Sequence, residues 1–259
     1  MAKKSQNRRT NAGAQAQVTN NRSSRGNSRG KSNVLNMSDY ASNIPQRARK
    51  SKVEIIPKNV HQEDYLYAID ALPVVFGVGP AGTGKTLLAT LKAIQAFKAG
   101  EIERIVITRP AVSVDEQHGF LPGSLIEKMA PWTRPIFDVF EEYFTPQQIE
   151  MMIAENTIEV APLAYMRGRT FHKCFVIADE IQLTTPNQMK MLLTRLGQGS
   201  TMVLTGDLEQ ADRADDNGLR DFLAKVDRME PENIEVIRFD QTDIERSVVV
   251  EEVLKIYNK

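Results

Sequence analysis

The chain has 259 residues, of which 41% are hydrophobic, with 33 basic and 33 acidic side chains. This apolar content suffices for a packed core and excludes a fully disordered chain, and the length suits one or two domains. No apolar run reaches the ~18 residues that cross a bilayer, and no apolar stretch follows the first charges as in a secretory signal. The single cysteine, Cys174, excludes an internal disulfide. We therefore expect a soluble, cytoplasmic protein.

The charges are divided unevenly along the chain. Residues 1–52 carry 12 basic side chains against one acid, Asp39, whereas the other 207 residues carry 21 basic and 32 acidic side chains. The basic segment is rich in Asn, Ser, Gln and Gly, and it buries too little apolar surface to offset its ordering entropy. We predict a disordered basic tail over 1–52 and a folded domain over 53–259. Such a tail could bind nucleic-acid phosphates, act as a transit peptide, or only keep the protein soluble.

Strands and helices alternate along the predicted domain. Short apolar runs predict strands at 73–78, 104–108, 158–161, 174–178, 202–205 and 234–239. Apolar stripes at helical spacing predict helices at 86–99, 187–196, 218–226 and 247–257. Residues 111–168 depart from the alternation and are predicted to form an insertion with helices and a strand. The pattern predicts an α/β fold, a mostly parallel sheet with helices on both faces.

A complete phosphate-binding loop follows the first predicted strand. Glycines in such a loop let backbone N–H groups turn toward a phosphate, and the next helix adds the partial positive charge of its N-terminus. The lysine reaches the β- and γ-phosphate oxygens, and the last hydroxyl is a ligand for Mg²⁺. The pattern G-x-x-x-x-G-K-[ST] is spelled by Gly79, Pro80, Ala81, Gly82, Thr83, Gly84, Lys85 and Thr86.

Acidic and amide side chains follow two later strands. Asp179 and Glu180 end the apolar run 174–178, and we expect Asp179 to hold Mg²⁺ and Glu180 to activate the attacking water. Gln210 follows the next strand in Gly-Asp-x-x-Gln at 206–210, where a polar group can sense the γ-phosphate. The plainer alternatives are a helix cap for the acids and an ordinary turn after the strand. Gln62, near a helix start, is either a reader of the adenine edge or a surface residue.

These motifs and four further blocks resemble the PhoH family of ATPases, over residues 57–257. The resemblance implies a RecA-like fold related to superfamily 1 helicase motors, binding and hydrolysis of ATP with Mg²⁺, ring-shaped homo-oligomers such as hexamers, and work on RNA. The chain departs from the family pattern at Ile181 and Leu183 and within residues 115–119 and 245–248. The blocks are Ile-Thr-Arg-Pro-Ala-Val at 107–112, Gly-Phe-Leu-Pro-Gly at 119–123, Ala-Pro-Leu-Ala-Tyr-Met-Arg-Gly-Arg-Thr-Phe at 161–171, and Thr-Thr-Pro-Asn-Gln-Met-Lys-Met at 184–191.

Arginines supply two further expectations. Phosphoryl transfer usually needs an arginine near the γ-phosphate, and about 200 folded residues leave no room for a second lobe that could supply one. We expect it from a neighbouring subunit; Arg246, which matches the family's near-terminal arginine, is the first candidate, before Arg167, Arg169 and Arg195. A path for single-stranded nucleic acid is the second expectation, unless its aromatic rings belong to the core. Its candidates are Arg109, Arg134, Arg167 and Arg169, with Trp132, Tyr165 and Phe171.

The leading interpretation is therefore an ATPase that acts on RNA or single-stranded DNA. The alternatives are a small-molecule kinase on the same scaffold and a nucleotide-responsive binding protein without catalysis. An adjacent Asp-Glu pair favours hydrolysis over transfer to a small molecule.

Overall fold

The computed structural model describes residues 49–110, 125–211 and 216–245, together with the single positions Val249, Val253 and Ile256. The chain divides into two units, Met1–Gln46 and Arg47–Lys259, and all described residues belong to the second. The predicted tail lies outside the described residues up to position 48. Arg49 and Lys50 already contact the folded unit, through Phe144 O and the Glu142 carboxylate.

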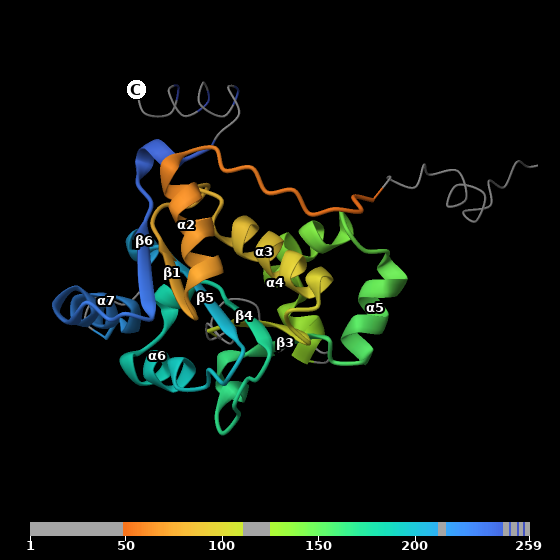
Figure 1. The fold of residues 1–259 in the computed structure, drawn as a ribbon. Helices are drawn as coiled ribbons and strands as arrows, with labels where there is room; N and C mark the ends of the chain where they lie inside the picture. The colour runs from red at the N-terminus through yellow and green to blue at the C-terminus, as the bar shows by residue number, and fades with distance from the viewer. Residues whose placement is uncertain are drawn as a thin grey trace, which may run out of the picture. The chain divides into compact units, whose positions relative to one another are not determined.

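Six parallel strands form one sheet in the order β3-β2-β4-β5-β1-β6 (Figure 1). Each strand begins and ends within one residue of its predicted position, because a strand buried on both faces appears in the sequence as a continuous apolar run. The strands are β1 (Val74–Val78), β2 (Arg104–Arg109), β3 (Ile158–Pro162), β4 (Cys174–Ala178), β5 (Thr201–Gly206) and β6 (Ile234–Arg238).

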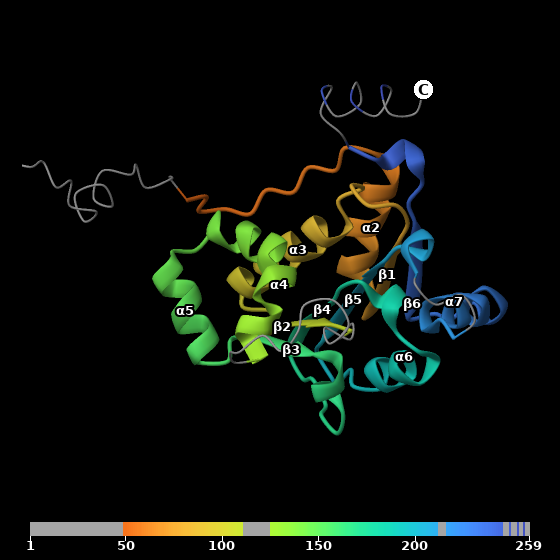
Figure 2. The same cartoon turned by 180° about the vertical axis from the view of Figure 1, so that it is seen from behind.

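Helices cover both faces of this sheet, as Figures 1 and 2 show from opposite sides. On one face, α2 (Val60–Ala71), α3 (Lys85–Ala99), α4 (Leu125–Glu141) and α5 (Pro146–Ala154) close a core that includes Val75, Ile107 and Ile177. On the other face, α6 (Pro186–Leu193) and α7 (Gly218–Met229) pack over Phe76 and Val176. The predicted mostly parallel α/β fold with two covered faces is confirmed.

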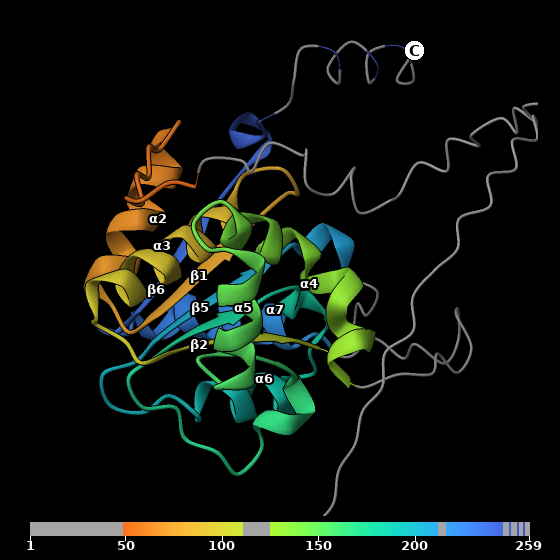
Figure 3. The same ribbon diagram turned by 90° about the vertical axis from the view of Figure 1, so that its right-hand side faces the viewer.

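The described part of the predicted insertion, residues 125–168, lies at one edge of the sheet. Its strand β3 pairs with β2 and is the edge strand, and it contacts α4 and α5, two helices that Figure 3 labels. Of the helix predicted at 247–257, the structure describes only the three single positions, which are helical. Among the described residues, no helix is long and apolar enough to span a membrane.

The strand order brings three chain segments to one edge of the sheet. The chain leaves β1 through α3 and returns at β2, so β5 and β4 lie between these two consecutive strands. Parallel strands all end at the same edge, and the loops after β1, β4 and β5 therefore meet there. Ligands of open α/β sheets bind at such a reversal of strand order.

Candidate nucleotide-binding site

The phosphate loop is held against the ends of its neighbouring strands. Gly79 N–H donates to Gly206 O at 3.0 Å, and Phe239 N–H donates to Val78 O at 2.8 Å. Gly79 has φ +145°, and a Cβ added there would lie 2.2 Å from Phe239 O, so only glycine fits. Gly84 is the N-cap of α3 with φ +83°. The loop thus starts at the end of β1 and leads into a helix N-terminus, as a phosphate site requires.

Lys85 is the first residue of α3, and its ammonium turns back onto the loop. Nζ donates to Gly79 O at 2.8 Å, to Pro80 O at 2.5 Å and to Thr83 Oγ1 at 3.0 Å. Burial lowers the pKa of Lys85, because it disfavours the charged form, while the carboxylates of Asp207, Glu180 and Asp179 oppose that shift. Anionic phosphate oxygens are stronger acceptors than the neutral oxygens that the ammonium contacts here.

Asp179 lies beside the hydroxyl at the end of the loop motif. Its Oδ1 accepts hydrogen bonds from Thr86 at 2.9 Å and from Thr205, near the end of β5, at 2.5 Å. Through these hydrogen bonds, one carboxylate oxygen connects the phosphate loop with the ends of β4 and β5. A hydroxyl and a carboxylate are the hard oxygen ligands that Mg²⁺ prefers. Thr86 and Asp179 therefore fit the metal role predicted for them.

Glu180 follows with a left-handed backbone, φ +55°. Its Oε2 accepts a hydrogen bond from Gln182 Nε2, and its Oε1 lies 3.8 Å from Arg109 Nη2. A non-glycine residue in this conformation is strained, and such residues cluster at functional sites. Glu180 lines the same pocket as Lys85 and Thr86.

Asp207 and Gln210 form the third wall, after β5. Gln210 Nε2 donates to Asp207 Oδ2 at 2.9 Å, and Asp207 Oδ1 accepts from Glu209 N–H at 2.9 Å. Asp207 is buried, whereas Gln210 is exposed at the mouth of the site. Gln210 is therefore placed where a polar group can meet an incoming ligand.

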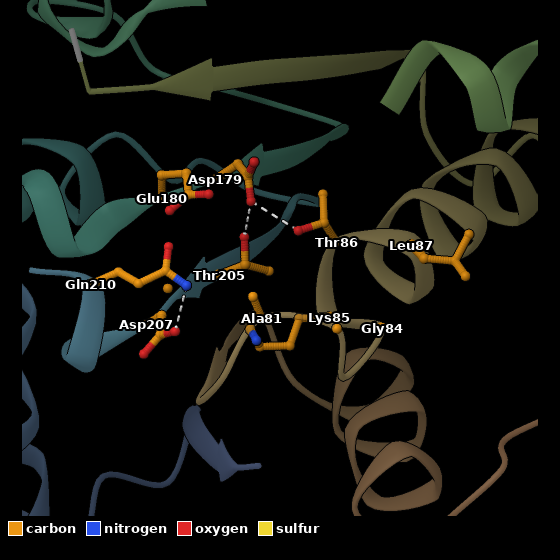
Figure 4. A pocket seen from close by; sticks show the side chains of 12 residues that line it. Ala81, Gly84, Lys85, Thr86, Leu87, Asp179, Glu180, Thr205, Asp207 and Gln210 are labelled. Atoms are coloured by element: carbon orange, nitrogen blue, oxygen red, sulfur yellow. Dashed lines mark hydrogen bonds between the residues drawn. The ribbon is translucent and has the colours of Figure 1, made fainter. Parts of the chain in front are cut away.

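These residues enclose one cavity of about 280 Å³, which we call the phosphate-loop cavity (Figure 4). In Figure 4, Asp179 and Glu180 face Lys85 across it, with Gln210 and Asp207 along one side. The two parts that the sequence predicts to act together, the glycine loop and the acidic pair, are thus neighbours. The lining residues are Ala81, Gly82, Gly84, Lys85, Thr86, Leu87, Asp179, Glu180, Thr205, Gly206, Asp207 and Gln210.

Gln62 lies behind the loop and does not line this cavity. Its side chain is 4% exposed, which rules out the surface alternative. Nε2 donates to Thr83 O at 3.2 Å and to Glu245 Oε1 at 3.3 Å, and Oε1 accepts from Lys58 N–H at 3.0 Å. The amide supports the phosphate loop, and its reading of adenine stays a prediction.

The arginines proposed to bind nucleic acid differ in their surroundings. Arg109 lies near the phosphate-loop cavity beside Glu180, and Arg134 is exposed on α4, paired with Asp138 at 2.7 Å. Arg169 pairs through Nη2 with Glu159 Oε2 at 2.7 Å. Arg167 is exposed on the turn after β3. Only Arg167 and Arg134 of these four therefore present strongly exposed guanidinium groups.

The aromatic half of the predicted path is partly wrong. Phe171 is fully buried in the core and cannot stack on a base, and Trp132, on α4, is half-buried against the core. Tyr165, near Arg167, is 61% exposed. For Phe171 the structure therefore supports the core alternative, because burial depends on packing against residues that are distant in the sequence.

Arg246 and Arg195 are the other two candidate arginines for the γ-phosphate. Arg246 lies outside the described residues. The residue before it, Glu245, is described, and its N–H donates to Gly82 O at 3.0 Å. Arg195 donates to Met191 O, Arg169 O and Thr194 Oγ1 within its own chain.

Two contributors to the site carry no clear signal in the sequence. Thr205 and Thr86 both donate hydrogen bonds to Asp179 Oδ1. In the sequence, Thr205 is only the polar residue that ends an apolar run. Phe239 supplies the carbonyl that restricts Gly79, and its ring lies 5.8 Å from Lys85 Nζ. A polar residue at a strand end beside the acidic pair is the one clue that could have indicated Thr205.

Comparison with known proteins identifies the family of the chain. A family model described as "PhoH-like protein" matches residues 54–258. The chain belongs to the PhoH family. PhoH-like proteins of Bacillus subtilis and Mycobacterium tuberculosis are 44% and 46% identical over 85% and 81% of this chain, and Protein PhoH of Escherichia coli is 39% identical over 79%. The chain spans 68%, 59% and 58% of these PhoH relatives, respectively.

Solved structures of similar fold are more distant from this PhoH family member. The large terminase of a thermophilic bacteriophage, in complex with ADP, is 11% identical over 75% of this chain and 48% of its own, with a TM-score of 0.47. The UvsW helicase of bacteriophage T4 is 15% identical over 78% and 66%, with a TM-score of 0.45. The predicted RecA-like P-loop fold itself is evident in the sheet order and the loop after β1.

Proposed function

We propose that this PhoH family member binds ATP with Mg²⁺ in the phosphate-loop cavity and hydrolyses it. The observation that carries the proposal is the meeting of Thr86 and Asp179 at 2.9 Å, with Lys85 and Glu180 in the same cavity. Oxygen ligands for the metal, a cation for the phosphates and a carboxylate for the water are the groups that phosphate-loop hydrolysis needs.

Each group has a distinct part in the proposed reaction. The backbone amides of the loop and Lys85 bind and orient the phosphates, and Thr86 with Asp179 would hold Mg²⁺, whose charge offsets that of the phosphates. Glu180 accepts a proton from the attacking water at its carboxylate. Gln210, at the mouth of the cavity, contacts the γ-phosphate or the water and so reports whether the phosphate is present.

We further propose that hydrolysis is coupled to RNA or single-stranded DNA, in a homo-oligomer. Two features support a nucleic-acid partner: the excess of basic residues over 1–52, and Tyr165 near Arg167, both exposed after β3. An exposed ring near a guanidinium suits base stacking with a phosphate contact. The oligomer is proposed because no arginine of the described residues lines the phosphate-loop cavity, so the arginine for the γ-phosphate would come from a neighbour.

Phosphate release measured with and without single-stranded RNA tests this function. We expect release that requires Mg²⁺ and rises with RNA. Glu180→Gln should still bind ATP but lose at least about 100-fold in turnover, because general-base catalysis contributes about 10²–10⁴-fold. Glu155→Gln, an exposed change at the end of α5, is the matched control. Phosphoryl transfer to a small acceptor without release of phosphate would instead indicate a kinase.

A further inference from the structure

Gln182 is a buried side chain that connects two walls of the phosphate-loop cavity. It lies on the short 3₁₀ turn η3 (Ile181–Leu183) and is 2% exposed. Its Oε1 accepts from Asp207 N–H at 3.1 Å, and its Nε2 donates to the Glu180 carboxylate. Its backbone carbonyl accepts from Asn217 Nδ2, at the N-cap of α7, at 2.7 Å. One residue thus joins the ends of β4 and β5 to the start of α7.

The orientation of this amide follows from its neighbours. A backbone N–H can only donate, so the amide oxygen must face Asp207 and the NH₂ group must face Glu180. Gly206 leaves room for this amide, because a Cβ at that position would lie 3.0 Å from Gln182 Oε1, tighter than an ordinary contact. The Gln182 amide therefore has one orientation against the backbone of its neighbours. Both of its ends form hydrogen bonds, as is usual for buried polar groups.

This arrangement gives the two oxygens of Glu180 different surroundings. Oε2 accepts from Gln182, whereas Oε1 lies 3.8 Å from Arg109 Nη2, beyond hydrogen-bond distance. Oε1 is therefore the oxygen left to accept a proton. Without the amide, the carboxylate could rotate toward the Arg109 guanidinium and form a closer pair that withdraws it from the cavity.

We propose that Gln182 is a positioning residue for hydrolysis. It holds the Glu180 carboxylate at the site of the attacking water and ties that position to the turn that carries Asp207 and Gln210. This inference rests on the proposed ATPase function. Movement of the 206–210 turn on loss of the γ-phosphate would then reach Glu180 through a single side chain.

Gln182→Met tests the proposal, because methionine has a similar volume and cannot form either side-chain hydrogen bond. We expect kcat to fall about 100-fold, the loss that a displacement of about 1 Å in a catalytic group can cause. The KM for ATP should stay within about threefold, since the loop and Lys85 are unchanged. Gln95→Met, exposed on α3, is the matched control and should keep the activity.

Gln182→Glu separates the two ends of the amide. The introduced carboxylate can still accept from Asp207 N–H, but once ionised it has no donor for the Glu180 carboxylate. We expect kcat to fall while the KM for ATP stays within about threefold, a split that a general loss of structure would not give.

The possible outcomes separate this inference from the proposed function. If the unchanged protein releases no phosphate, with or without RNA, the ATPase proposal fails. If it hydrolyses ATP and folded Gln182→Met keeps kcat within about threefold, only the positioning role is refuted. If Gln182→Met fails to fold, a folded Gln182→Glu that keeps kcat within about threefold refutes it.

Discussion

Gly79 shows how a single backbone position decides whether the phosphate loop can form. An added Cβ would lie 2.2 Å from Phe239 O, a backbone atom that cannot move alone, because Phe239 N–H is bonded to β1. We predict that Gly79→Ala lowers the free energy of unfolding by more than about 2 kcal/mol, beyond the strain of its positive φ alone. Thermal or urea unfolding measures it.

Gly100 is the control for this prediction. It also has a positive φ, +74°, at the C-cap of α3, but nothing lies within 4 Å of an added Cβ. Gly100→Ala should therefore cost only about 1 kcal/mol, the penalty of the left-handed conformation. Equal losses in the two variants would show that the close approach of Phe239 is unimportant.

His61 predicts a pH dependence of stability. The hydrogen bond between its Nδ1 and Asp243 Oδ2, 2.7 Å long, raises the pKa of His61. A group whose pKa is higher in the folded than in the unfolded protein stabilises the fold. This stabilisation is complete at a pH below the ordinary histidine pKa of about 6.5, and it is lost as the pH rises through the pKa of the folded protein. His61→Gln removes this contribution, so we expect the melting temperature of the variant to change less between pH 6 and pH 8.5 than that of the unchanged protein. An unchanged difference would assign the pH dependence to other groups.

At the scale of elements, α2 and the segment 240–245 support the phosphate loop from behind. Gln62, in the first turn of α2, bonds Thr83 O, and Glu245 N–H bonds Gly82 O. Since Gln62 contacts the loop backbone, we predict that Gln62→Ala weakens binding of ATP and GTP by equal factors. Equilibrium titration with both nucleotides measures this. Loss of ATP affinity alone would instead support the reading of adenine by Gln62.

The elements themselves were largely predictable. Six strands followed from apolar runs, and the meeting of residues 79–86 with Asp179 followed from the rule that parallel strands end at one edge. The bridge made by Gln182 and the approach of Arg109 to Glu180 were not predictable, because they depend on the packing of side chains far apart in the sequence. The spacing of residues in the sequence predicts which strand ends lie together, but it does not predict which side-chain atoms form hydrogen bonds.

At the scale of the whole molecule, the basic residues 1–48 can be tested by deletion. Arg49 and Lys50 should be kept, because they contact Phe144 and Glu142 in the folded unit. If the deleted segment binds nucleic acid, the dependence of log affinity on log salt should become shallower by about 0.7 for each single-strand phosphate that the segment had neutralised. Titration of single-stranded RNA at several salt concentrations measures it. An unchanged slope would assign the phosphate binding to the folded unit.

The central claim is that a nucleoside triphosphate binds in the phosphate-loop cavity, against Lys85 and opposite Asp179. Calorimetric titration of ATP with Mg²⁺ tests it most directly, on the unchanged chain, Lys85→Ala and Lys190→Ala, an exposed change on α6. The account predicts saturable binding that Lys85→Ala weakens at least tenfold, since a charge-assisted hydrogen bond contributes about 1.5–3 kcal/mol, and that Lys190→Ala leaves unchanged. Equal ATP affinity in all three proteins would contradict it.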